Sequence, residues 1–134
     1  MKKVTVADKV LGTIFILFGF CGAIGTLLQP MLAGLAKAQP QAAQIPTLGP
    51  VEMAVSTASA ILLLIGGIGM WLAGRWGHML VVLGCAAAIA FGAWHMVSPV
   101  AGSTAANLIG GAVGIALDAA FAGYCVWRLS TDKE

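Results

Sequence analysis

Charge is scarce in this sequence. Only 9% of its 134 residues are charged, whereas 60% are hydrophobic. A soluble domain carries roughly 25% charged residues, so this chain has too little charge to cover a surface that faces water. Its mean hydropathy of +0.96 agrees with that conclusion. The composition excludes an ordinary soluble protein and predicts that lipid is the main solvent of the chain.

Patterns of known chemistry are also missing. The sequence contains no G-x-S-x-G, no H-E-x-x-H and no phosphate-binding glycine loop, the patterns that position a nucleophile, a metal or a phosphate. The net charge of +2 is small and scattered, which excludes a basic stripe for nucleic acid. We therefore expect no enzymatic activity and no nucleic-acid partner.

Metal and cofactor ligands are sparse as well. Cys21, Cys85 and Cys125 stand apart inside apolar runs, without a C-x-x-C pair, so they are interpreted as small packing residues. His78 and His95 are 17 residues apart, about 25 Å along a helix, and cannot ligate one haem together. We therefore expect no metal and no cofactor, and interpret both histidines as anchors at the membrane boundary.

What the sequence does have is four long apolar runs, at about 10–28, 51–73, 79–97 and 105–127. Each is close to the roughly 20 residues that a membrane-spanning helix needs. Because the runs are continuous rather than alternating, they favour helices over strands. The predicted fold is all-α: one polytopic membrane domain over 1–134, with four transmembrane helices in an antiparallel bundle.

Capping residues and prolines indicate where these helices begin and end. Thr5 and Asp8 have the spacing of a capping box, and Pro50 suits the first turn of the second helix. Pro30 is expected to end the first helix. An outer loop at 30–49 follows, within which Met31–Ala38 can form a short interfacial helix.

The basic residues predict an orientation. Six of the seven Lys and Arg fall on one side of a four-span arrangement, and only Lys37 falls on the other. The positive-inside rule then places both termini in the cytoplasm, with the aromatic belt and Arg75 at the same boundary. An alternative is a signal peptide cleaved near Ala36-Lys37-Ala38, although the apolar run is longer than the usual core of about 7–15 residues.

Asp118 is the carboxylate nearest the middle of a predicted membrane helix. It continues a stripe of small residues four apart, Ala106, Gly110, Gly114, Asp118 and Ala122, and is expected to face a neighbouring helix. Two interpretations stay open. Asp118 either binds a proton or a cation, or pairs structurally with a hydroxyl or with a partner chain.

Other polar and small residues supply further candidates. Glu52 in the first turn of the second helix suits the helix dipole, and with Ser56 and His95 it can instead line an outer vestibule. Close packing in lipid depends on small residues. The predicted packing positions are Gly84, Ala88, Gly92, Gly110 and Gly114.

Two segments carry a resemblance. GIGMWLAGRWGHMLVVLG at 67–84 and the closing AGYCVWRLS resemble small uncharacterised four-helix proteins of bacterial membranes, in which a glycine-rich helix ends in a short Arg/Trp turn. This resemblance implies the bacterial inner membrane and no established activity. The first expectation is a non-enzymatic accessory or assembly subunit, or a homo-oligomer. The alternative is a small transporter or channel in which Asp118 couples to protons or cations.

Overall fold

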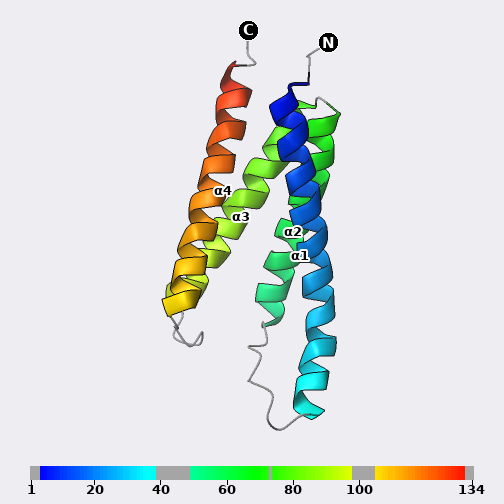
Figure 1. The fold of residues 1–134 in the computed structure, drawn as a ribbon, viewed down its shortest axis with the longest axis vertical. Coiled ribbons are helices and arrows are strands. Elements are labelled where there is room, and N and C mark those ends of the chain that lie inside the picture. Colours follow the sequence, from blue (N-terminus) through cyan, green and yellow to red (C-terminus); the bar gives the residue numbers. More distant parts are fainter. Residues whose placement is uncertain (1–3, 39–48, 73, 98–104, 132–134) are drawn as a thin grey trace.

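The computed structural model describes residues 4–38, 49–72, 74–97 and 105–131. These ranges form four helices: α1 (Val6–Ala38), α2 (Pro50–Trp71), α3 (Arg75–Val97) and α4 (Ala105–Thr131) (Figure 1). Each of the four contains a segment long and apolar enough to cross a membrane. The prediction of an all-helical chain with four such segments is confirmed.

The starts of α1 and α2 follow the predicted local signals. The Asp8 N–H donates to the Thr5 hydroxyl (3.2 Å), and the Thr5 N–H donates to the Asp8 carboxylate (3.0 Å), which is the reciprocal pattern of a capping box. Pro50 is the first residue of α2, and the Gly49 N–H donates to the Glu52 carboxylate (2.8 Å). Both predicted helix starts are therefore confirmed.

The prediction that Pro30 ends the first helix is wrong. Helix α1 continues through Pro30 to Ala38, so residues 30–38 of the expected outer loop are helical, and 39–48 lie outside the described residues. Proline removes one N–H and crowds the carbonyl four residues earlier. The helix tolerates this single lost bond because Met, Leu and Ala, which follow, are strong helix formers.

A close approach of two glycines makes the turn between α2 and α3 tight. Helix α3 begins at Arg75 rather than at 79. A Cβ added at Gly77 would overlap the backbone of Gly69 and Met70, so the two helix ends can touch only without side chains there. The Gly74 N–H also donates to the Gly69 carbonyl (3.0 Å) and closes the turn.

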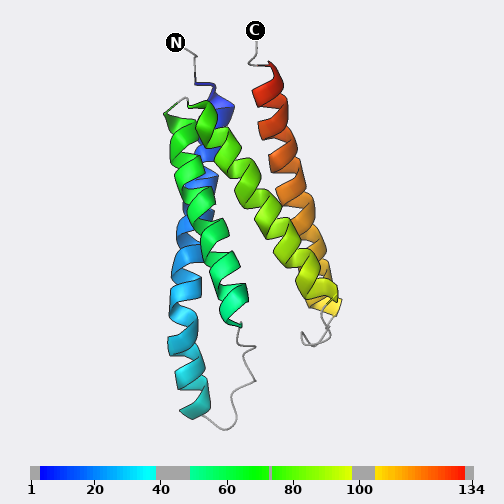
Figure 2. The same cartoon turned by 180° about the vertical axis from the view of Figure 1, so that it is seen from behind.

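Consecutive helices pack side by side, whereas α1 and α4 meet mainly at one end. Both termini lie at this end, and the α3–α4 pair diverges from α1–α2 toward the other end (Figures 1 and 2). The buried core also lies here. Its members are Phe15, Met70, Val81, Cys85 and Cys125. The Phe15 ring meets Phe121 of α4 edge to face, with centroids 5.2 Å apart, so α1 and α4 contact each other through this layer.

Candidate functional site

A dense cluster of polar contacts surrounds the carboxylate of Asp8, in the first turn of α1. Its Oδ2 accepts hydrogen bonds from the Thr5 N–H (3.0 Å), the Thr5 hydroxyl (2.7 Å) and Nη2 of Arg128 (3.3 Å). Its Oδ1 accepts one from the Tyr124 hydroxyl (3.1 Å) and lies 3.3 Å from Nε2 of His78. Asp8 is only 3% exposed. One carboxylate therefore joins residues of α1, α3 and α4.

The local structure of each helix brings these groups together. The capping turn at Thr5 fixes the direction of the Asp8 side chain. His78 lies in the first turn of α3, which starts directly after the tight turn from α2. Tyr124 and Arg128 are four residues apart and share one face of α4. The contact between Phe15 and Phe121 lies deeper in the bundle than Asp8, so the polar cluster covers one end of the apolar core.

The charges in this cluster balance. A buried charge is tolerated when it is paired and hydrogen-bonded, and Asp8 has a guanidinium, a phenol, an imidazole and a threonine around it. The Arg128 side chain is 21% exposed, whereas those of His78 and Asp8 are 8% and 4% exposed. The arrangement ties the start of α1 to the start of α3 and the end of α4.

Sequence reasoning found only part of this cluster. It assigned Asp8 to a cap, which is confirmed, and placed His78 at the membrane boundary as an anchor. That interpretation of His78 is wrong, because the residue is 6% exposed and contacts Asp8. One signal was available: Asp8, His78, Tyr124 and Arg128 all fall at the same predicted membrane boundary. Residues at one depth can meet even when they are far apart in sequence.

Asp118 lies on the side of α4 that faces the bundle, together with Ala122 of the predicted stripe. Ile115 packs against α3 and Ala122 packs against the core. Asp118 is three and four residues from them, so it shares their face and is partly buried. Within the described residues no hydrogen bond or ion pair involves its carboxylate. Its role as a functional or a pairing residue stays a prediction.

The three residues predicted to line an outer vestibule make two separate contacts. Glu52 Oε1 lies 3.8 Å from His95 Nε2, and the two side chains are 29% and 32% exposed. They link the start of α2 to the end of α3. Ser56 instead turns toward α1, where its hydroxyl lies 3.4 Å from the hydroxyl of Thr26. The structure thus brings Glu52 and His95 together without Ser56, and the vestibule stays a prediction.

The predicted small-residue positions differ in what they contact. Gly84 lies against α2, where its carbonyl accepts a hydrogen bond from Ser59 (3.0 Å), and Gly92 faces Ile115 of α4. Ala88 is partly buried on α3. In contrast, a Cβ added at Gly110 or Gly114 would have no atom of the described residues within 4 Å. No helix of the described residues therefore packs on these two glycines, and their packing role stays a prediction.

The described residues contain no group of three His, Cys, Asp or Glu side chains that could hold a metal ion. Cys85 and Cys125 are buried in the core, whereas Cys21 is exposed. Comparison of the chain with protein-family models, with curated proteins and with solved structures finds no match.

Proposed function

We propose that the chain is a non-enzymatic, multi-pass protein of the bacterial inner membrane, with antiparallel helices and both termini in the cytoplasm. It works as a subunit of a membrane assembly, either an accessory or assembly subunit of a larger complex or a homo-oligomer. The four long apolar helices support the membrane location. Lys9, Arg75 and Arg128 belong to helix turns at the end that carries both termini (Figure 1), which supports the orientation.

The proposal of an assembly rests on the apolar surface of α4 that the other helices leave exposed. Within the described residues, only 6% of an 18-residue apolar stretch of α4 is buried inside the chain, against 33% for α2. The open positions Gly110 and Gly114 have the G-x-x-x-G spacing that lets a second helix approach closely. Asp118 lies one turn further along and has no partner among the described residues. A helix of another subunit that packs on Gly110 and Gly114 would cover the face of α4 that the described residues leave open.

Native mass spectrometry from a mild detergent tests this proposal. The native chain is expected as a multimer or with a bound partner, and Gly114→Leu is expected to release monomer by blocking close approach. Gly123→Leu is the matched control, because Gly123 is equally open but nine residues further, on the opposite side of α4. A native chain that is strictly monomeric and binds nothing contradicts the proposal, as does equal behaviour of the two variants.

A second candidate function is a small transporter or channel for protons or cations. It is favoured by the position of Asp118, which faces the bundle, is partly buried and has no partner among the described residues. Flux measured in proteoliposomes is expected to disappear in Asp118→Asn and to persist in Glu52→Gln, whose carboxylate already contacts Gly49 and His95. Flux that survives Asp118→Asn unchanged removes this candidate. Lost flux with assembly intact favours it over the subunit role.

A further inference from the structure

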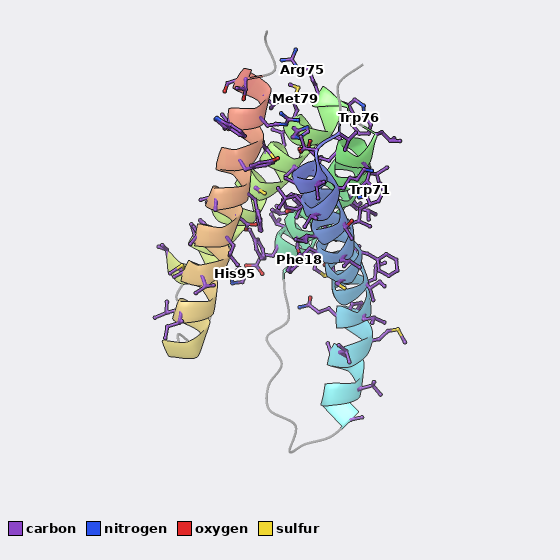
Figure 3. All side chains as sticks on the ribbon, turned by 45° about the horizontal axis from the view of Figure 1, so that its top comes forward. Phe18, Trp71, Arg75, Trp76, Met79 and His95 are labelled. Carbon is purple, nitrogen blue, oxygen red and sulfur yellow. The ribbon has the colours of Figure 1, made fainter. Side chains whose placement is uncertain are left out.

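The end of the molecule that carries both termini presents two cations beside two indole rings. We call Lys9, Trp71, Arg75 and Trp76 the cationic rim. The Lys9 ammonium lies 5.8 Å from the centre of the Trp71 ring, which is within the range of a cation–π contact. Arg75 is exposed at the start of α3, next to Trp76. Figure 3 shows Trp71, Arg75 and Trp76 gathered where α2 passes into α3.

The two indole rings are held in place. The Trp71 N–H donates to the Thr13 hydroxyl of α1 (3.1 Å), and its ring lies over Gly12, where a Cβ would collide with it. The Trp76 ring lies in the same way over Gly74. Both tryptophans nevertheless remain 46% exposed. The rim is thus a built surface with rigid, half-exposed rings.

The cations of the rim have no acidic partner in the part of the chain that the structure describes. Asp8, which precedes Lys9 in the first turn of α1, is buried and is bound by Arg128. The other described acids, Glu52 and Asp118, lie one at the opposite end and one far along α4. Among the described residues, Lys9 and Arg75 therefore carry positive charge without an acidic partner, at a surface that also carries indole rings.

We propose that the cationic rim binds the headgroup of an anionic phospholipid. This rests on the membrane location proposed above and adds a lipid preference to it. Lys9 and Arg75 would contact the phosphate, and the indoles would lie at the level of the headgroups, where tryptophan is favoured. Basic residues near an anionic membrane surface contribute about 1 kcal/mol each, which corresponds to roughly a fivefold change in affinity per residue.

The test uses the full chain reconstituted in nanodiscs of phosphatidylcholine with a minor share of phosphatidylglycerol. Native mass spectrometry after mild detergent extraction counts the retained lipids. The native chain is expected to retain phosphatidylglycerol in preference to phosphatidylcholine. Lys9→Gln and Arg75→Gln should each lower that preference roughly fivefold, and the double variant should abolish it. Lys37→Gln removes one positive charge outside the rim and is the matched control, with the preference expected unchanged.

Several outcomes overturn the proposal. They are equal retention of the two lipids by the native chain, an unchanged preference in the double variant, and an equal loss in Lys37→Gln. The proposal is also overturned if soluble glycerol phosphate competes as effectively as the lipid does. An acidic protein segment that occupies the rim in place of lipid overturns it as well. Failure of the chain to enter nanodiscs at all contradicts the membrane location itself, so the two failures are distinguishable.

Discussion

Replacing Asp8 by Asn should destabilise the bundle far more than the loss of a helix cap alone would. Asn keeps the size of the side chain but removes its charge and turns an amide N–H toward groups that are themselves donors. Asp8 is 3% exposed and is contacted by Arg128, Tyr124 and His78. Removing one partner of a buried ion pair costs about 3–5 kcal/mol. Because Arg128 keeps some contact with solvent, we expect about 3 kcal/mol, at the lower end of that range.

Glu52→Gln is the matched control for this prediction. Glu52 also occupies the first turn of its helix and accepts a backbone N–H, that of Gly49 (2.8 Å). Its side chain is 29% exposed, and its contact with His95 is 3.8 Å long. A partly exposed pair of this kind contributes about 0–1 kcal/mol. The two variants therefore separate the effect of a cap from the effect of contacts between helices.

The measurement is reversible unfolding in mixed micelles of mild detergent and sodium dodecyl sulfate, followed by tryptophan fluorescence. A cycle of Asp8→Asn, Arg128→Gln and the double variant should give a coupling free energy of about 1.5 kcal/mol, because residues in one hydrogen-bonded network are not additive. Equal losses in Asp8→Asn and Glu52→Gln, or a coupling near zero, would refute the idea that Asp8 ties α1 to α4.

The same unfolding assay tests two further contacts. Gly67→Val should cost about 2 kcal/mol because its new side chain meets the backbone of Gly12 on α1 and forces the helices apart. Gly25→Ala is the control: no atom of the described residues lies within 4 Å of the added Cβ, so stability should stay unchanged or rise by about 0.5–1 kcal/mol. Similar losses in both variants would contradict this reasoning. Ser59→Ala should cost about 1 kcal/mol, because it removes the bond from the Ser59 hydroxyl to the Gly84 carbonyl, and a loss below the error of the assay would show that this bond adds nothing between α2 and α3.

The sequence predicted the elements well where the signal was local. Four apolar runs became four helices, and the starts at Thr5 and Pro50 followed capping rules that depend on neighbouring residues only. The prediction at Pro30 was wrong because a general rule about proline was applied without weighing the helix formers that follow it. The packing of the predicted stripe through Gly110 and Gly114 stays a prediction, since periodicity alone does not say which face a neighbouring helix covers.

By itself the sequence determined that this is an all-helical chain with four helices suited to a bilayer, because hydropathy and capping are properties of consecutive residues. Only the tertiary structure decided what Asp8 contacts. His78, Tyr124 and Arg128 lie 70, 116 and 120 residues away from it, and they meet it because helices α1, α3 and α4 converge at one end. That convergence depends on the close approach of helices at glycines such as Gly67 and Gly77, which is a property of paired surfaces rather than of any one segment.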